Sequence, residues 1–259
     1  MHPGSIPGEA SNPGSCLCRV VRSGRPVCFP RREWGVNMND EFSERRVKMV
    51  DGQLRTTDVT DAALLEAFLS LPREAFVPAD QRDIAYIDED IRIATSLDGA
   101  RYLMEPSPMA KLLQLAEVDA TDHALVIGCG SGYSAAVLSR LAGSVVALES
   151  DATLAELAES TLSQLGCDTV TVVRGALRDG HAAKAPYDVI FIDGAVEELP
   201  AGLTEQLAEG GRLVAVEGRG NAGVARLYVK AEGVVTGRRA FNAAIKPLPG
   251  FERVEAFVF

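Results

Sequence analysis

The sequence predicts an α/β fold built around a doubly wound, mostly parallel sheet. Short apolar runs alternate with helical patterns after about residue 120, which is the order of elements that produces such a sheet. These runs are continuous rather than alternating, as strands buried on both faces should be. The first run leads directly into a glycine-rich turn and then a helix, as in nucleotide-binding α/β folds. A chain of 259 residues with 47% hydrophobic residues can bury a large core.

The first 37 residues differ from the rest of the chain. They contain five arginines and only two glutamates, are rich in proline and glycine, and show neither helical nor strand periodicity. We therefore predict that residues 1–37 form a disordered extension. Met38 follows directly, and because ordered patterning starts there, it is a candidate for the natural start of translation.

Residues 38–120 are expected to form a helical region. Apolar residues recur at helical spacing in three stretches, and Asp61 is placed to cap the second of them. The stretch Ile91–Glu105 shows no clear period and is predicted to be a loop. The three predicted helices cover 41–55, 61–70 and 106–117, and a proline-bounded connection covers 71–78.

Residues 121–259 carry the predicted sheet. Asp151 and Gly166 provide a cap and a stop for the longest helix of this region, and a turn is expected at Gly210–Gly211. The last segments could pair antiparallel. Strands are predicted at 124–127, 144–149, 169–173, 187–193, 212–217, 227–231, 234–236 and 254–259, and helices at 133–141, 151–165 and 203–208.

The turn after the first strand indicates a cofactor site. Its pattern is Gly128-x-Gly130-x-Gly132, which lets a ligand approach the backbone closely. Glu149 ends the second strand, where a carboxylate can accept hydrogen bonds from both hydroxyls of a ribose. The spacing is not that of a pyrophosphate cradle, so it favours S-adenosylmethionine over a dinucleotide. A purely structural turn with a surface glutamate is the alternative.

Several longer stretches resemble the protein-L-isoaspartate (D-aspartate) O-methyltransferase family, over essentially all of residues 45–259. Two of them lie outside the cofactor fold and are therefore specific to the family. The stretches are MVDGQLR at 49–55, PREAFVP at 72–78, Ala85-Tyr86, LVIGCGSGYSAAVLSRL at 125–141, PYDVIFIDGA at 186–195 and QLAEGGRLVAVEG at 206–218.

The resemblance implies a Rossmann-like class I methyltransferase with a seven-stranded sheet. It implies that residues 38–120 form an N-terminal helical cap with the substrate loop, and that 121–259 bind S-adenosylmethionine. The implied substrates are proteins or peptides bearing isoaspartyl residues, whose carboxylates are methylated. By position the implied cofactor-binding residues are Gly128, Cys129, Gly130, Ser131, Gly132, Glu149, Ala176 and Asp193.

The chain departs from the family pattern in its substrate loop. The family places a G-Q-T-I-S-Q-P segment where this chain has Ala100–Pro106, so that Tyr102 and Met104 replace hydroxyl residues. Methionine cannot donate a hydrogen bond to a carboxylate. Arg101 and Tyr102 are the expected catalytic replacements, because a guanidinium fork matches a carboxylate; Thr95 and Ser96 are further candidates.

Two other departures affect the cofactor side. Ala176 stands where the family commonly has an aspartate for the adenine amino group, and Asp193 stands where it tends to have a threonine. Asp193 also resembles a magnesium ligand of other methyltransferases, but no matching acid or amide accompanies it, so no metal is expected. Arg73 is expected to be a surface charge or a member of a salt bridge rather than a substrate ligand.

The predicted function is carboxyl methylation of damaged proteins. The alternatives are a cofactor-binding protein without repair activity, with a regulatory or interaction role, and a methyltransferase with another acceptor. The formal net charge of −10 makes nucleic acid a poor partner, and no apolar run has the roughly 18 residues of a membrane span. Cys129 and Cys167, without an expected disulfide, favour the cytoplasm.

Overall fold

The computed structural model describes residues 16–20, 26–30, 41–96 and 99–253. The chain divides into two compact units, Met1–Gly35 and Val36–Phe259. In the first unit β1 (Cys16–Val20) pairs antiparallel with β2 (Pro26–Pro30). These ten residues thus differ from the predicted disordered extension, because strands of five residues are too short to show periodicity. The remainder of 1–37 lies outside the described residues, as does the predicted strand at 254–259.

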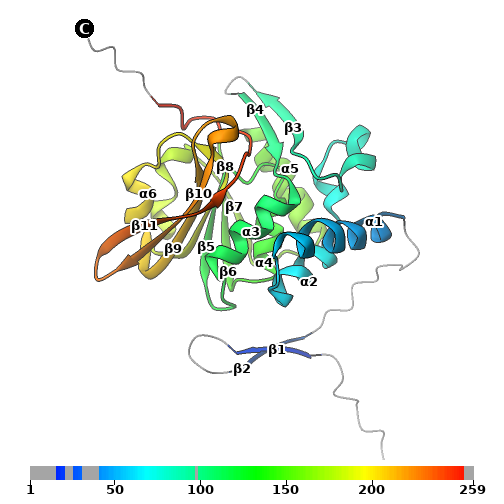
Figure 1. The fold of residues 1–259 in the computed structure, drawn as a ribbon, viewed down its shortest axis with the longest axis horizontal. Helices are drawn as coiled ribbons and strands as arrows, with labels where there is room; N and C mark the ends of the chain where they lie inside the picture. The colour runs from blue at the N-terminus through cyan, green and yellow to red at the C-terminus, as the bar shows by residue number, and fades with distance from the viewer. Residues whose placement is uncertain (1–15, 21–25, 31–40, 97–98, 254–259) are drawn as a thin grey trace, which may run out of the picture. The chain divides into compact units, whose positions relative to one another are not determined.

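The second unit contains a seven-stranded sheet in the order β11-β10-β9-β8-β5-β6-β7. Strands β5 to β9 run parallel to one another, whereas β10 pairs antiparallel with both β9 and β11. This confirms the predicted doubly wound fold (Figure 1). The strands are β5 (His123–Ile127), β6 (Ser144–Glu149), β7 (Val170–Arg174), β8 (Tyr187–Val196), β9 (Leu207–Glu217), β10 (Val224–Ala231) and β11 (Val234–Asn242).

The sheet order places a reversal of chain direction beside β5. The chain moves from β5 outward to β6 and β7, and then returns to β8 on the other side of β5. Ligands of open α/β sheets bind at the carboxyl ends of the strands at such a point. The end of β5 is therefore where the topology favours a binding site.

The helices form largely where the sequence places them. The Asp61 carboxylate accepts a hydrogen bond from Leu64 N at 2.9 Å, and the Asp151 carboxylate accepts from Thr153 N and Leu154 N at 2.8 and 3.0 Å. The helices are α1 (Glu41–Met49), α2 (Ala62–Ser70), α3 (Pro106–Ala116), α4 (Tyr133–Ser139), α5 (Ala152–Gln164) and α6 (Ala201–Glu205). A π-helical segment (Val50–Leu54) and a 3₁₀ turn (Arg55–Thr57) continue α1.

Two predictions about local structure are wrong. The predicted loop at 91–105 is an antiparallel hairpin of β3 (Ile91–Ser96) and β4 (Gly99–Leu103). The register shifts after Arg92, and this irregularity breaks the alternation by which strands are recognised. The predicted turn at Gly210–Gly211 lies within β9, where its pairing with β8 also shifts register.

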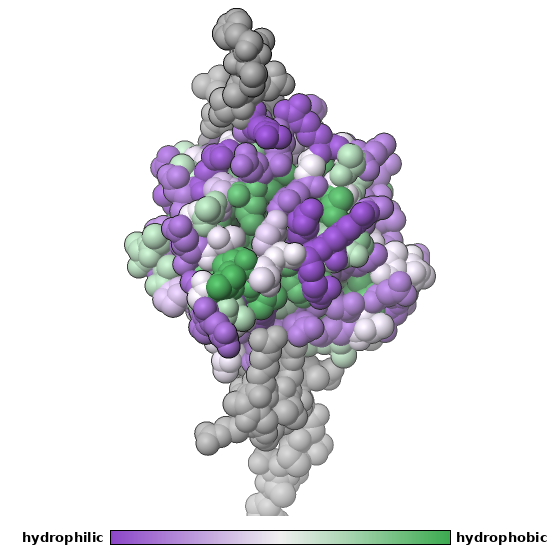
Figure 2. All heavy atoms as spheres, turned by 60° about the vertical axis from the view of Figure 1, so that its left-hand side comes forward, coloured by the Kyte–Doolittle hydropathy of each residue, from purple (hydrophilic) through white to green (hydrophobic). Residues whose placement is uncertain are grey.

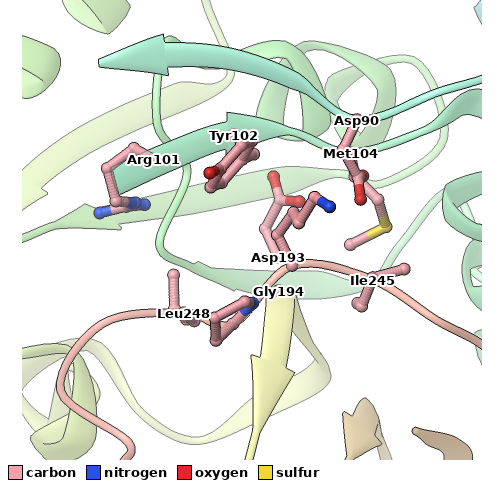
Figure 3. Close-up of a pocket in the computed structure, with 10 residues that line it drawn as sticks. Asp90, Arg101, Tyr102, Met104, Asp193, Gly194, Ile245 and Leu248 are labelled. Carbon is pink, nitrogen blue, oxygen red and sulfur yellow. The ribbon is translucent and has the colours of Figure 1, made fainter. Parts of the chain in front are cut away.

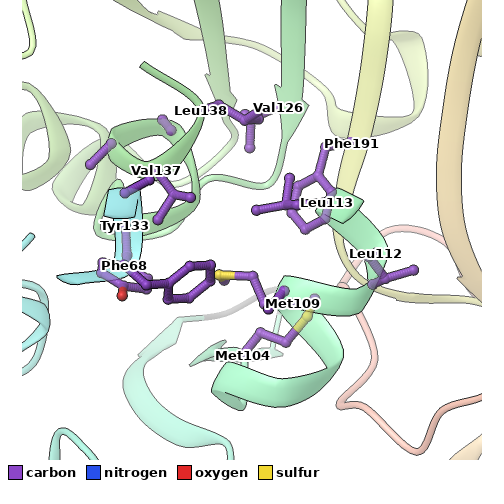
Figure 4. Close-up of a cluster of buried hydrophobic side chains, with 14 of the residues drawn as sticks. Phe68, Met104, Met109, Leu112, Leu113, Val126, Tyr133, Val137, Leu138 and Phe191 are labelled. Atoms are coloured by element: carbon purple, nitrogen blue, oxygen red, sulfur yellow. The ribbon is translucent and has the colours of Figure 1, made fainter. Parts of the chain in front are cut away.

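Alternate residues of the central strands point into two separate hydrophobic layers. Val126 of β5 and Phe191 of β8 pack with the N-terminal helices and α4 (Figure 4), whereas Leu125 and Ile190 belong to the layer on the opposite face. Period-two separation of this kind is what a sheet covered on both sides requires. The N-terminal helices therefore complete one layer of the core.

The surface is mixed in character. On the face shown in Figure 2, hydrophobic side chains gather in the middle and hydrophilic ones surround them. Only a few large hydrophobic side chains of the described residues are exposed, namely Val47, Ile84, Ile87, Leu157 and Val234. No helix within the described ranges has the length and apolar character needed to cross a membrane.

Candidate functional site

The glycine turn follows β5 and lies against the end of β6. Gly128 N and Cys129 N both donate hydrogen bonds to Leu148 O, at 2.9 and 3.2 Å. Gly128 and Gly130 have φ angles of 77° and 56°, in the left-handed region that residues other than glycine rarely adopt. The pattern at 128–132 thus produces a turn whose backbone faces the carboxyl edge of the sheet.

Glu149 ends β6 with its carboxylate fully buried beside this turn. Three backbone N–H groups donate to it: Gly130 N to Oε2 at 2.8 Å, and Ser150 N and Asp151 N to Oε1 at 2.8 and 3.1 Å. Backbone donors stabilise an ionised carboxylate. They also fix the orientation of the carboxylate at the ends of the strands.

Arg101 pairs directly with Glu149. Its Nη1 donates to Oε1 at 2.6 Å and its Nη2 donates to Oε2 at 2.9 Å. Nη2 also donates to Gly128 O at 2.9 Å, and only 4% of Arg101 is exposed. The structure therefore joins the expected substrate-binding arginine to the expected ribose-binding glutamate, a contact between residues 48 positions apart that the sequence does not indicate.

Two apolar side chains lie against the glycine turn. A Cβ atom placed on Gly128 would be 2.6 Å from Leu248 Cδ1, and one placed on Gly130 would be 2.8 Å from Ile93 Cδ1. Ile93 belongs to β3, and Leu248 to the segment that follows β11. This segment runs beside the end of β8, where Leu248 N donates to Ala195 O at 2.8 Å.

The space between the hairpin, the end of β8 and the C-terminal segment is a small cavity (Figure 3). Its volume is about 10 Å³, about the room that one water molecule needs. The lining residues are Asp90, Arg101, Tyr102, Met104, Asp193, Gly194, Ile245, Lys246, Pro247 and Leu248. The predicted residues Arg101, Tyr102 and Asp193 thus meet in one place, while the contribution of residues 245–248 was not predicted, since no motif marks them.

Asp193 is the buried acid of this cavity. Burial raises its pKa to about 7, an effect opposed by the nearby Ser134 side chain and by the charges of Arg101 and Arg73. Its Oδ1 has no hydrogen-bond partner within the described part of the chain. A carboxyl group of this kind can be neutral near pH 7 and then has a proton to donate.

Acidic side chains cluster around Asp90, one of the residues that line the cavity. Burial and the neighbouring acids Asp88, Asp90 and Glu89 raise the pKa of Glu105 to about 7. The exposed Lys246 also lines the cavity, with its Nζ 5.9 Å from the centre of the Tyr102 ring. The cavity is therefore bordered by carboxyl groups as well as by a cation.

The remaining predicted cofactor residues lie along the same edge. Ser131 Oγ donates to Phe76 O at 2.6 Å, which ties the glycine turn to the N-terminal region. Burial raises the pKa of the Cys129 thiol well above its usual value, which disfavours a nucleophilic thiolate. Ala176 is exposed just after β7, next to Gly175, whose N donates to Glu149 O at 3.1 Å.

Arg73 corrects an expectation. It is not a surface charge but is fully buried. Its Nε donates to Ala85 O at 2.7 Å, its Nη2 donates to Met104 O at 2.8 Å, and its guanidinium lies 4.9 Å from the centre of the Tyr133 ring. It thereby fixes the end of the β3–β4 hairpin. The one sequence feature that distinguishes Arg73 from the other arginines is its position in the short connection between Pro72 and Pro78.

The arrangement fits an adenosyl cofactor in its chemistry. Glu149 offers two oriented carboxylate oxygens at the switch point, and the turn at 128–132 allows a ligand to lie close to the backbone. The fit requires movement, because Arg101 covers the carboxylate and Leu248 and Ile93 cover the glycines.

Comparisons with known proteins agree on one family. A sequence model described as protein-L-isoaspartate(D-aspartate) O-methyltransferase matches residues 44–250. A protein-L-isoaspartate O-methyltransferase of Koribacter versatilis is 38% identical over 173 residues, 67% of this chain and 76% of the relative. A second, from Anaeromyxobacter sp., is 35% identical over 206 residues, 80% of this chain and 83% of the relative.

Solved structures give the same result. One of a protein-L-isoaspartate O-methyltransferase has a TM-score of 0.70 and 28% identity, and the match covers 79% of this chain and 66% of that one. A chain from Plasmodium falciparum, solved in complex with S-adenosyl-L-homocysteine, has a TM-score of 0.67 with 19% identity, covering 81% and 99%. This second likeness extends to the fold alone.

Proposed function

This chain belongs to the protein-L-isoaspartate(D-aspartate) O-methyltransferase family, and from that premise we propose how its own residues carry out the reaction. The enzyme transfers a methyl group from S-adenosylmethionine to isoaspartyl carboxylates in proteins. The relatives support this activity rather than the two alternatives, a protein without repair activity or a methyltransferase with another acceptor.

The cofactor is proposed to bind along the carboxyl edge of the sheet. Glu149 accepts hydrogen bonds from both ribose hydroxyls, Gly128 to Gly132 lie against the methionine part, and Ala176 lies on the adenine side. The observation that carries this proposal is the orientation of Glu149 by three backbone N–H groups at 2.8, 2.8 and 3.1 Å. Such charge-assisted bonds hold an acceptor pair ready for a diol.

The substrate carboxylate is proposed to bind against Arg101, Tyr102 and Asp193, after the movement that the site requires has widened the small cavity that they line. The cofactor supplies an activated methyl group, and a carboxylate is itself a competent nucleophile, so the protein contributes chiefly position and exclusion of water. Arg101 holds the carboxylate by its guanidinium fork. Tyr102 donates a hydrogen bond from its hydroxyl, and Asp193, when neutral, does not repel the substrate.

Methyl transfer to a defined peptide tests the function. The enzyme is incubated with methyl-labelled S-adenosylmethionine and either an isoaspartyl peptide or the same peptide with a normal aspartyl residue. We expect label on the isoaspartyl peptide alone. Absence of label on that peptide, in the presence of measurable cofactor binding, would contradict the proposed activity.

Replacement of the ribose acceptor tests the cofactor assignment. Glu149→Ala should weaken S-adenosylhomocysteine binding by about 1.5–3 kcal/mol, the scale of hydrogen bonds to a charged group. Isothermal titration calorimetry measures the change, and Glu156→Ala, on the exposed face of α5, is the matched control. Equal affinity of Glu149→Ala and the wild type would remove Glu149 from the site.

We also propose a cytoplasmic location. Cys129 and Cys167 are free and buried, as is usual in a reducing compartment. Fractionation of cells that express the full chain should recover it in the cytoplasmic fraction; recovery with membranes or outside the cell would contradict the proposal.

A further inference from the structure

Arg101 occupies the two acceptor oxygens that the cofactor requires. Each oxygen of Glu149 receives one N–H of the guanidinium, at 2.6 and 2.9 Å. We propose that the cofactor ribose displaces Arg101 from Glu149, and that the released guanidinium becomes the receptor for the substrate carboxylate. This inference rests on the proposed function and adds an order of binding to it: cofactor first, then substrate.

The guanidinium of Arg101 and a ribose offer Glu149 the same kind of donor pair. A guanidinium presents two parallel N–H donors on one rigid plane, and a ribose presents two neighbouring O–H donors. Either pair can satisfy the same two carboxylate oxygens, but not at the same time. The backbone donors from Gly130, Ser150 and Asp151 remain in place during the exchange, because they belong to the turn and to β6.

The released guanidinium needs a new anion. Arg101 and Glu149 are 4% and 0% exposed, and a buried charge without a partner is strongly unfavourable. Arg101 lies on β4 next to Tyr102, and both side chains line the cavity in which the substrate carboxylate is proposed to bind. The substrate therefore supplies the anion that Glu149 no longer provides.

The exchange couples the two binding events. Before the cofactor binds, Arg101 is neutralised by Glu149 and the cavity presents the carboxyl groups of Asp90 and Asp193 to an incoming anion. After the exchange, the guanidinium in the cavity is no longer neutralised by Glu149. Cofactor binding should thus raise the affinity for an isoaspartyl peptide, and by thermodynamic linkage the peptide should raise the affinity for the cofactor by the same factor.

Calorimetry with S-adenosylhomocysteine tests the displacement. Because Arg101→Gln removes the competing donor, it should bind S-adenosylhomocysteine about 10-fold more tightly than the wild type, given the usual strength of charged hydrogen bonds. Arg92→Gln, an exposed position of the same hairpin, removes the same charge and should leave the affinity unchanged. An Arg101→Gln variant with equal or weaker affinity than the wild type would overturn the proposal.

Peptide binding tests the coupling. Fluorescence anisotropy of a labelled isoaspartyl peptide should show at least about 5-fold tighter binding with S-adenosylhomocysteine present, a typical size for such coupling. This gain should persist in Arg92→Gln and disappear in Arg101→Gln. An equal gain in Arg101→Gln, or none in the wild type, would refute the coupling.

Two further measurements keep the result interpretable. If Arg101→Gln does not fold, Arg101→Lys takes its place: it retains the charge but loses the fork, so it should bind S-adenosylhomocysteine more tightly than the wild type. A wild type that does not methylate the isoaspartyl peptide would refute the proposed function. If the wild type methylates the peptide but neither Arg101→Gln nor Arg101→Lys binds S-adenosylhomocysteine more tightly than the wild type does, only the exchange is refuted.

Discussion

At the scale of single residues, the site depends on buried charges whose partners lie far away in the sequence. Glu149 ends β6, and Asp193 lies near the end of β8; Glu149 is satisfied by donors, whereas Asp193 has an unpartnered Oδ1 among the described residues. Hydrophobic patterns predicted the end of β6 at Glu149, whereas β8 continues past its predicted end at Asp193 to Val196. The different environments of the two acids were not predictable, because they come from Arg101, Arg73 and Ser134, which belong to other elements.

Asp193 should make stability depend on pH. Its pKa is about 7 in the folded chain against an ordinary value of 3.8, so between these values the folded chain holds a proton that the unfolded chain has lost. The free energy of unfolding should therefore fall as the pH rises from 4 to 7. Asp193→Asn should remove this part of the slope.

Urea denaturation of both proteins at pH 5, 6, 7 and 8 measures the effect. Because only the wild type loses this stability, the free energy of unfolding of the variant minus that of the wild type should increase up to about pH 7 and then become constant. A difference that does not change with pH would mean that Asp193 is ionised throughout.

At the scale of elements, local signals and long-range contacts contributed differently. The glycine turn, the helix caps and the continuous apolar strands are local, and the structure has them near the predicted positions. The β3–β4 hairpin was missed for two reasons. Its buried residues include the charged Arg101 as well as the apolar Ile91 and Leu103, and its register shifts after Arg92. An arginine is a core residue here only because Glu149 lies opposite it.

The cap of α5 gives a prediction at this scale. Asp151 accepts hydrogen bonds from Thr153 N and Leu154 N, so Asp151→Ala should lower the free energy of unfolding by about 1 kcal/mol. Glu156→Ala removes an acid from the exposed face of the same helix and should change it by less than about 0.5 kcal/mol. Equal effects of the two substitutions in chemical denaturation would contradict the capping role.

At the scale of the whole molecule, the second unit contains its own core and the entire candidate site. Arg212 of β9 connects its parts: it donates hydrogen bonds to the Asp122 carboxylate before β5 at 2.7 Å and to the carbonyl groups of Ala116 and Glu117 at the C-terminal end of α3. The composition of the chain predicted this division near residue 37, because patterning begins there. How residues 245–248 complete the cavity could not be predicted, since it depends on the packing of the C-terminal segment against β8.

Removal of residues 1–37 tests the division. A protein that starts at Met38 should have the same thermal midpoint and the same affinity for S-adenosylhomocysteine as the full chain, because both depend on the second unit. Differential scanning fluorimetry and calorimetry make the comparison. A lower midpoint or weaker binding would show that the first unit supports the fold or the site.

A crystal structure with S-adenosylhomocysteine tests the central claim most directly. We expect both ribose hydroxyls within hydrogen-bond distance of the Glu149 carboxylate and the Arg101 guanidinium turned away from it toward Tyr102. Bound S-adenosylhomocysteine with the pair between Arg101 and Glu149 still intact, or with its ribose at another position, would contradict the account.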